Sequence, residues 1–285
     1  MSAPVKLVLF GALLALVFAG SALAGSALGP EPEVSEPAHA GGGHDEPKAA
    51  APGAVYEVRG LATEAGGLRL VVDDPELRRG RAETLRFRIV DGRGATVRDF
   101  DVEHTKRMHL ILARRDLTGF QHLHPEQRAD GAWVAEARLA EAGSYRLLAD
   151  FSRGGEPQTL ASDLRVDGAA DLRPLPAPAP VAVSDGYDVR LDAAAVRPGA
   201  EAELRFTITR GGEPIATEPY LGAGGHLVAL REGDLAFLHV HPTEGAGGGE
   251  IGFAATFPTA GRYRLFLQFQ HGGRIHTVAF TQAVR

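Results

Sequence analysis

The chain of 285 residues contains an internal duplication whose unit is about one domain long. Leu85-Arg86-Phe87 matches Leu204-Arg205-Phe206, and the segment 143–147 (Gly-Ser-Tyr-Arg-Leu) matches 261–265 (Gly-Arg-Tyr-Arg-Leu). Any structure of this chain must therefore repeat one fold in tandem. Features that the two copies share follow from a common fold as readily as from a common function.

The organisation of the chain follows from its composition. We expect a signal peptide or membrane anchor at 1–24, a flexible tether at 25–53, a β-sandwich domain at 54–168, a Pro-rich linker at 169–183 and a second β-sandwich domain at 184–285. The tether is rich in Ala, Gly, Pro and Glu and has no apolar period, which is typical of flexible segments. The alternating prolines of the linker predict an extended, semi-rigid spacer.

The N-terminal segment has the features of an export signal. Lys6 precedes an apolar run from Leu7 to Ala19, and Ala22-Leu23-Ala24 fits the small-residue pattern of a signal-peptidase site. An uncleaved anchor is the alternative, because extension of the run to Leu23 approaches the length of about 20 residues that a membrane span needs. Both alternatives predict an exported protein on the extracellular, cell-envelope or periplasmic side.

Several classes of function are excluded by what the sequence lacks. It contains no cysteine, which excludes disulfides, thiolate metal sites and lipid-modified cysteine anchors. The net charge is -6 and the arginines are dispersed, so no basic stripe predicts nucleic-acid binding. No nucleophile elbow, phosphate loop or redox CxxC motif occurs. We therefore predict a protein that is not an enzyme and has no organic cofactor.

The sequence pattern of each repeat predicts a series of short strands. Alternating runs of apolar residues are interrupted at close intervals by Gly, Pro and Asp, and no long window shows a helical apolar stripe. The clearest runs are Leu68 to Val72, Thr84 to Val90, Met108 to Ala113, Trp133 to Leu139 and Ser144 to Phe151. The predicted fold class is all-β, with two tandem immunoglobulin-like antiparallel β-sandwich domains after the N-terminal segment.

Six of the eleven histidines occur in a duplicated spacing of one histidine followed, thirteen residues later, by HxHP. They are His109, His122 and His124 in the first repeat, and His226, His239 and His241 in the second. Imidazole is the commonest protein ligand for borderline metals and titrates near neutral pH, so this constellation is the best indication of function.

A hairpin in each repeat would bring these histidines together. In the second repeat, Gly233-Asp234 is a two-residue turn signal, and a turn centred there places His226 opposite His241, with Cβ atoms about 5 Å apart. His239 lies two positions from His241 and shares its face, roughly 7 Å along the strand. In the first repeat Asp116-Leu117 occupies the corresponding turn, and His109 would face His124.

Other residues near these hairpins are weaker candidates. His271 and His276 flank Gly272-Gly273 in the next hairpin of the second repeat and are possible additional metal ligands. Met108 points away from the histidine face if its strand is regular, which argues against ligation. His39 and His44 lie in the tether, where chance occurrence in a solvated linker is the simpler interpretation.

A metal bound by imidazoles in a chain without cysteine is predicted to be Cu(II) or Zn(II), because Cu(I) prefers thiolate or several thioether ligands. A hydrolytic zinc site would need a general base, and Glu126 follows HxHP in the first repeat only. The alternative is structural: the histidine face also carries Val228, Leu230 and Phe237, so neutral histidines could close the end of a hydrophobic core.

The stretch 225–242 (GHLVALREGDLAFLHVHP), with Tyr263-Arg264-Leu265-Phe266 after it, resembles an uncharacterised family of secreted or membrane-anchored bacterial proteins with duplicated immunoglobulin-like HxHP domains. More distantly, Pro198-Gly199 leading to Leu204-Arg205-Phe206 is similar to YtkA-like domains, which are linked with extracytoplasmic metal handling. The resemblance implies location and architecture rather than chemistry.

Together these observations predict an extracytoplasmic, non-enzymatic binding protein that handles a transition metal through clustered histidines, as a carrier, buffer or sensor. Its partners would be the metal ion and an envelope or membrane protein. The alternative is a structural or protein-interaction module of the cell envelope with purely structural histidines.

Overall fold

A computed structural model describes residues 58–238, 240–243 and 249–285, and every regular element in these ranges is a β-strand. The predicted all-β fold class is therefore confirmed. The expected signal or anchor segment and the tether lie outside the described residues. Within the described part of the chain, no helix has the length and apolar character needed to cross a membrane.

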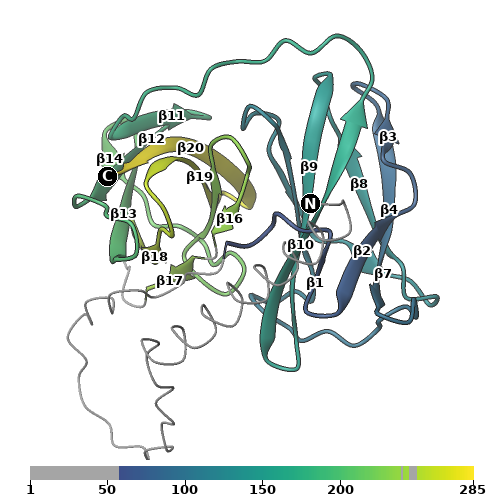
Figure 1. Ribbon diagram of the computed structural model, residues 1–285. Coiled ribbons are helices and arrows are strands. Elements are labelled where there is room, and N and C mark those ends of the chain that lie inside the picture. Colours follow the sequence, from purple (N-terminus) through teal and green to yellow (C-terminus); the bar gives the residue numbers. More distant parts are fainter. Residues whose placement is uncertain (1–57, 239, 244–248) are drawn as a thin grey trace, which may run out of the picture. The chain divides into compact units, whose positions relative to one another are not determined.

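The first repeat forms a sandwich of two five-stranded sheets (Figure 1). One sheet has the order β1-β2-β4-β8-β7 and the other β3-β10-β9-β5-β6. The strands are β1 (Glu64–Ala65), β2 (Leu68–Val72), β3 (Glu76–Leu77), β4 (Ala82–Asp91), β5 (His109–Arg114), β6 (Gln121–Leu123), β7 (Glu126–Gln127), β8 (Trp133–Arg138), β9 (Gly143–Arg153) and β10 (Glu156–Val166). All five strands predicted by name are present, with ends shifted by at most a few residues.

The second repeat forms a sandwich of the same type. Its sheets have the orders β11-β12-β13-β18-β17, with β14 paired to β13, and β16-β15-β19-β20. The strands are β11 (Val181–Ser184), β12 (Tyr187–Ala193), β13 (Glu201–Arg210), β14 (Glu213–Pro214), β15 (His226–Arg231), β16 (Phe237–Leu238), β17 (His241–Pro242), β18 (Glu250–Thr256), β19 (Gly261–His271) and β20 (Arg274–Val284). Both repeats are thus immunoglobulin-like sandwiches.

Two features mark the immunoglobulin-like pattern. Strand pairs are antiparallel except β3 with β10, which run parallel. Each repeat also has a tyrosine corner, in which a tyrosine hydroxyl donates to a backbone carbonyl four residues earlier. Tyr145 donates to Glu141 at 2.9 Å and Tyr263 donates to Thr259 at 3.0 Å. These bonds fix the start of the long strands β9 and β19.

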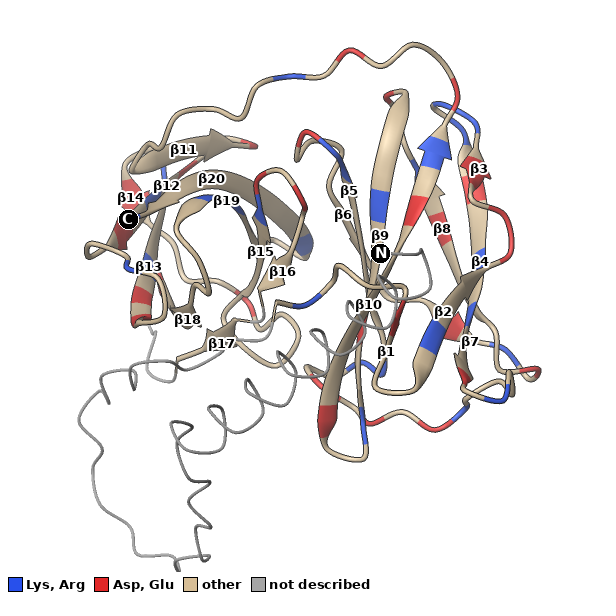
Figure 2. Ribbon diagram, in the orientation of Figure 1, with Lys and Arg blue, Asp and Glu red and all other residues tan. Residues whose placement is uncertain are grey.

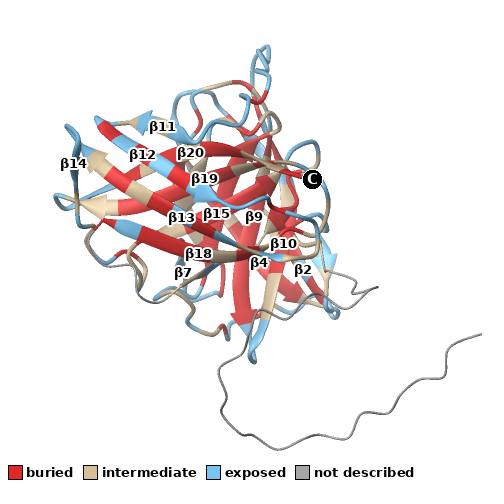
Figure 3. Ribbon diagram, turned by 90° about the vertical axis from the view of Figure 1, so that its left-hand side faces the viewer, coloured by how far each residue is buried: buried red, intermediate tan, exposed pale blue. Residues whose placement is uncertain are grey.

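Alternation explains which face of each strand is buried. Along β12 the burial alternates from buried Tyr187 to exposed Asp192, as expected for a sheet with one solvated face. In contrast, β5 is buried at all six positions, and β9 is buried over most of its length (Figure 3). A strand buried on both faces needs a second covering layer.

That second layer is a third hydrophobic core, separate from the core inside each sandwich. It joins the outer faces of β5, β9 and β10 to those of β15 and β19. Its buried members are Ile111, Ala113, Leu117, Leu148, Ala161, Leu175, Val228, Leu230, Leu235, Phe237 and Phe266. The Phe120 and Phe266 rings stack across it with centroids 4.0 Å apart. The core fixes the strand faces on which His109 and His226 lie.

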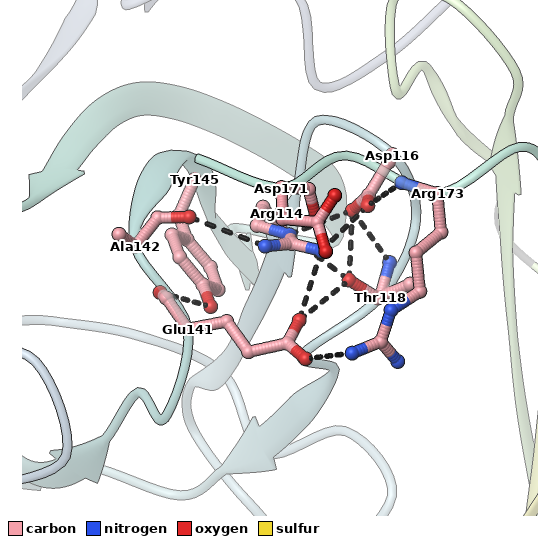
Figure 4. A network of polar contacts seen from close by, with 8 residues as sticks. All are labelled: Arg114, Asp116, Thr118, Glu141, Ala142, Tyr145, Asp171 and Arg173. Carbon is pink, nitrogen blue, oxygen red and sulfur yellow. Dashed lines mark hydrogen bonds and ion pairs between the residues drawn. The ribbon is translucent and has the colours of Figure 1, made fainter. Parts of the chain in front are cut away.

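A buried arginine ties the first repeat to the start of the linker (Figure 4). The side chain of Arg114 is 1% exposed, and its guanidinium donates to Asp116 Oδ1 and Oδ2 at 2.9 and 2.7 Å. It also donates to the backbone carbonyls of Ala142 and Asp171, at 3.2 and 3.0 Å, and pairs with Glu141 at 2.8 Å. Each of the three nitrogens of this buried cation therefore has at least one acceptor, as burial requires.

Charged side chains on the outer sheet of the first repeat are paired with each other. Arg86 and Arg88, on β4, each contact both Asp73 and Asp130. Basic and acidic residues are interspersed along this sheet and its loops (Figure 2). Exposed pairs of this kind contribute little to stability, about 0–1 kcal/mol each.

Candidate metal centre

The β5–β6 hairpin brings three of the predicted histidines together. Its register pairs Leu110 with Leu123 and Ile111 with His122, so the predicted alignment of His109 with the HxHP element is confirmed. His109, Ile111 and His122 share the outer face of the sheet. His124 follows β6 directly and extends the same row of side chains.

The three rings are close enough to share one ion. One ring nitrogen from each of His109, His122 and His124 lies within 4.8 Å of the other two. The ring centroids of His109 lie 5.2 Å from those of His122 and His124, and the latter two are 4.7 Å apart. Among the described residues, no other group of three or more such side chains meets this spacing.

Hydrogen bonds fix the tautomers of two rings. His109 Nε2 lies 3.2 Å from the carbonyl oxygen of Glu103, and His122 Nδ1 lies 2.7 Å from Gln268 Oε1. Both oxygens only accept, so each of these outer nitrogens donates. The Gln268 amide is oriented by its Nε2, which donates to Thr277 Oγ1 at 3.3 Å. The inner nitrogens, His109 Nδ1 and His122 Nε2, then face each other at 3.0 Å.

His124 is the third ring of the group. Its Nε2 is buried and has no hydrogen-bond partner in the described part of the chain. A pocket of about 590 Å³ opens beside this ring, lined also by Lys106, Arg107, Met108 and Trp133. Met108 itself is 1% exposed and packs in the core of the first sandwich, so it points away from the histidine face, as predicted.

Burial keeps these imidazoles neutral. It lowers the pKa of His109 and of His124 to about 4, and places the pKa of His122 well below the ordinary value. The other histidines of the group oppose protonation further. At neutral pH the ring nitrogens that do not donate therefore carry lone pairs, the form in which imidazole binds a metal.

A buried carboxyl group lies beside the cluster. Asp150 on β9 is the Cα partner of His109 and accepts a hydrogen bond from Thr159 Oγ1 at 2.6 Å. Burial raises the pKa of Asp150 to about 7. Gln268 holds the corresponding position on β19, where it pairs with His226 and contacts Thr277. The two repeats thus differ in charge at equivalent points beside the cluster.

Two further histidines join the three. His226 on β15 has its ring centroid 5.6 Å from His109 and 4.8 Å from His122, stacked at 9° and 25°. His104, before β5, lies 6.1 Å from His109 and 5.8 Å from His226. Sequence reasoning missed His104 because it has no counterpart in the duplicated pattern: Leu221 occupies the corresponding position, and both residues have positive φ, 46° and 54°.

His241 does not lie opposite His226, and that expectation was wrong. The β15–β16 register is as predicted, pairing Ala229 with Leu238 and Leu230 with Phe237. The chain then crosses to the other sheet, where His241 pairs with Ala254 of β18 and is exposed. His239 lies outside the described residues.

His271 and His276 lie on the other face of their sheet, away from His226. They extend the inner face of β19 and β20, and His276 is the Cα partner of Phe269, a residue of the sandwich core. His271 Nδ1 lies 2.8 Å from the Tyr187 hydroxyl, and His276 Nδ1 lies 3.1 Å from Asp185 Oδ2. These two histidines therefore do not supply further ligands to the cluster around His226.

A family model described as "Domain of unknown function (DUF8832)" matches the chain twice, at residues 63–168 and 181–285. The chain belongs to this family. The two matches coincide with the two sandwiches, so one family domain corresponds to one repeat. No curated protein matches the chain at a significant level. The similarity to YtkA-like domains stays a prediction.

Solved structures similar to this chain include bacterial adhesins. The adhesin FdeC of Escherichia coli is 17% identical, with a TM-score of 0.28, over 79% of this chain and 66% of that chain. A Salmonella alpha-2-macroglobulin is 14% identical, with a TM-score of 0.29, over 82% and 16%. Invasin, a bacterial integrin-binding protein, is 14% identical, with a TM-score of 0.22, over 75% and 39%. This chain spans only part of each, and likenesses at these TM-scores do not extend to function.

Proposed function

We propose that this protein is an exported, non-enzymatic binding protein that holds a transition metal ion, Zn(II) or Cu(II), on His109, His122 and His124. The observation that carries the proposal is the direction of the hydrogen bonds. The outer nitrogens of His109 and His122 donate to oxygens, and their inner nitrogens face each other. Metal-binding histidines are typically held in this way by outer partners.

The inner nitrogens lack a proton between them. Two neutral imidazoles carry two N–H protons, and both are used in the bonds to Glu103 and Gln268. Two lone pairs at 3.0 Å repel each other unless a cation lies between them. A tetrahedral ion with bonds of about 2.0–2.1 Å separates its ligand nitrogens by about 3.3 Å, so a small shift of either ring admits the ion.

The ring positions agree with this geometry. Around a tetrahedral ion, imidazole centroids lie about 5 Å apart, because each ring centre is about 3 Å from the metal. The three centroid separations in the cluster are 5.2, 5.2 and 4.7 Å. A nitrogen-only, cysteine-free set of ligands suits Zn(II) and Cu(II), whereas Cu(I) prefers sulfur.

Binding rather than catalysis fits the surroundings of the cluster. Glu126, the residue considered as a general base, is exposed and pairs with Arg128 at 3.2 Å. The nearby buried carboxyl group, on Asp150, accepts a hydrogen bond from Thr159. The apolar run at 7–19 and the small residues at 22–24 support export. We therefore propose a metal carrier, buffer or sensor at the cell envelope, with an envelope protein as its partner.

Calorimetric titration of the full metal-free chain with Zn(II) and Cu(II) tests the proposal. We expect micromolar or tighter binding in the wild type and none of it in a variant carrying His109→Ala, His122→Ala and His124→Ala. His241→Ala is the matched control, because His241 is exposed on the other sheet, and it should bind as the wild type does.

Equal heats in the wild type and the triple variant would reject the metal site. The histidines would then act as structural groups that brace the contact between the repeats, through bonds such as His122 to Gln268. That result would favour the second candidate function, a protein-interaction module of the envelope.

A further inference from the structure

We infer that the metal centre is shared by the two repeats, with His226 of the second repeat as its fourth ligand. This inference rests on the proposed function and extends it. The sequence pattern alone predicts two separate sites, one in each repeat. The structure instead places the His226 ring beside those of His109 and His122.

Two separations of the His226 ring are close to those of a fourth imidazole. Its nitrogens do not lie within 4.8 Å of all three ligand nitrogens of the first repeat, so the ring must turn toward the ion on binding. Its centroid lies 4.8 Å from His122 and 5.6 Å from His109, on either side of the separation of about 5 Å expected around a tetrahedral ion. His104 is farther, at 6.1 Å from His109 and 5.8 Å from His226, so it lies outside the ligand set. Burial also lowers the pKa of His226 well below its ordinary value, which keeps the ring neutral.

The third hydrophobic core holds His226 in place. His226 begins β15 and shares its outer face with Val228 and Leu230, both fully buried in that core. Across the interface, Ile111 follows His109 on the same face of β5 and belongs to the same core. Each histidine is thus the first outward residue of a strand whose following outward residues pack against the opposite repeat.

The second repeat also supplies a positioning residue. Gln268, the Cα partner of His226, accepts the Nδ1 proton of His122 at 2.7 Å. It thereby selects the tautomer in which His122 Nε2 is free to bind the ion. The second repeat therefore contributes one ligand and one outer partner to a centre whose other three ligands belong to the first.

Two consequences distinguish this arrangement from one site per repeat. The chain binds one ion rather than two, because His241 lies on the other sheet and His226 is used at the shared centre. The ion also links β15 of one repeat to β5 of the other, so metal binding strengthens the contact between the repeats.

The experiment is a zinc titration of the full chain combined with X-ray absorption at the zinc edge. We expect one ion per chain, bound by four imidazoles. His226→Ala should leave three imidazoles and weaken affinity by about 100-fold, since loss of even an outer partner costs about 10–100-fold. If His226→Ala fails to fold, His226→Gln takes its place, because glutamine keeps more of the side-chain volume. His226→Gln should likewise show three imidazoles at the zinc.

The controls separate the two proposals. His104→Ala and His241→Ala should keep four imidazoles and the wild-type affinity. Unchanged affinity and imidazole count in both His226 variants would overturn the shared centre while leaving the three-histidine site intact. Two ions per chain would also overturn it. Failure of the wild type to bind zinc or copper would instead reject the proposed function itself.

Discussion

The β5–β6 and β15–β16 hairpins have the same histidine spacing and the same register, yet they place their HxHP elements differently. In the first repeat β6 continues to Leu123, and pairing with the opposite sheet resumes at Glu126, so His124 lies in the crossover. In the second repeat pairing with the opposite sheet begins two positions earlier, at His241. A shift of the crossover by two residues moves the last histidine from the cluster to another sheet.

This difference shows that a repeated sequence motif does not by itself determine where its residues lie in the fold. The register of each hairpin is a local property of its turn, whereas the crossover depends on β8 and β18, which are distant in sequence. The second repeat keeps His226 at the cluster because that residue belongs to β15, in the interior of its sheet, rather than to the crossover. Among the described residues, one copy of the motif supplies three histidines to the cluster and the other supplies one.

The two repeats also differ at the arginine that ends β5 and β15. Arg114 is 1% exposed and its partner Asp116 is 5% exposed, whereas the Arg231 and Asp234 side chains are 17% and 40% exposed. Arg114 also bonds to the linker at Asp171, while Arg231 bonds to Thr259 at 2.7 Å. The same residue type thus forms a buried network in one repeat and a half-exposed pair in the other.

The largest effect is therefore expected for Arg114→Ala, which should lower the free energy of unfolding by about 3–5 kcal/mol, because it removes the cationic partner of the buried Asp116. Arg231→Ala should cost about 1–2 kcal/mol, since water replaces much of what is lost. Urea unfolding of both variants measures the difference. Equal losses would show that the network in Figure 4 contributes no more than the half-exposed pair.

The second prediction concerns the pH dependence of the metal-free protein. The folded pKa values of His109 and His124, about 4, lie below the unfolded value, so folding favours the neutral rings. Their stabilisation is present above about pH 6.5 and is lost as the pH falls toward 4. For His109 alone this amounts to at most about 3 kcal/mol, at 1.36 kcal/mol per pKa unit.

Asp150 acts in the opposite direction over the same range. Its pKa is raised by burial to about 7, so its contribution to stability grows as the pH falls from 7 toward 4. The loss of stability between pH 6.5 and 5 should therefore be steeper in Asp150→Asn and flatter in His109→Asn. Denaturant unfolding at several pH values in the presence of a chelator tests both. A wild-type stability that rises on acidification would contradict the neutral-histidine assignment.

Much of the fold was predictable from the sequence because its determinants are local. Alternating apolar residues indicated the strands, and Gly233-Asp234 correctly indicated the register of its hairpin. The apolar face of Val228 and Leu230 was also correctly linked to a hydrophobic core beside His226. That core proved to lie between the repeats, a contact that no single-repeat pattern specifies.

The candidate site was predictable only in part. The grouping of His109, His122 and His124 followed from one hairpin, but the approach of His226 depends on packing between repeats. A signal for that packing was present, because the run 227–230 (Leu-Val-Ala-Leu) is apolar at every position, as in a strand covered on both faces. His104 carried no signal in the repeat, since its counterpart is Leu221.

The third prediction concerns Gln268, the counterpart of Asp150 in the second repeat. Gln268→Leu removes the acceptor of the His122 Nδ1 proton, so the ring is free to adopt the other tautomer. Zinc affinity should fall by about 10–100-fold with the fold unchanged. Gln270→Leu is a matched control, since Gln270 lies on the same strand and donates to Glu218, at 2.8 Å. Equal affinities for the two variants would show that Gln268 has no positioning role.

The smallest expected effect lies in the hairpin turns. Gly119 has φ of 62°, and a Cβ added there would lie 2.8 Å from Tyr145 Cε1, in the tyrosine corner. Ala236 precedes Phe237 as Gly119 precedes Phe120, and it is not among the residues with positive φ. Gly119→Ala should therefore cost about 1–2 kcal/mol from the left-handed backbone, with displacement of Tyr145 in addition.

The reverse change in the second repeat provides the comparison. Ala236→Gly should cost only about 0.5–1 kcal/mol, mainly through the greater freedom of glycine in the unfolded chain. Thermal unfolding of both variants is the measurement. If Gly119→Ala proves neutral, the two turns are interchangeable, and the different paths of the two HxHP elements must arise in the crossovers alone.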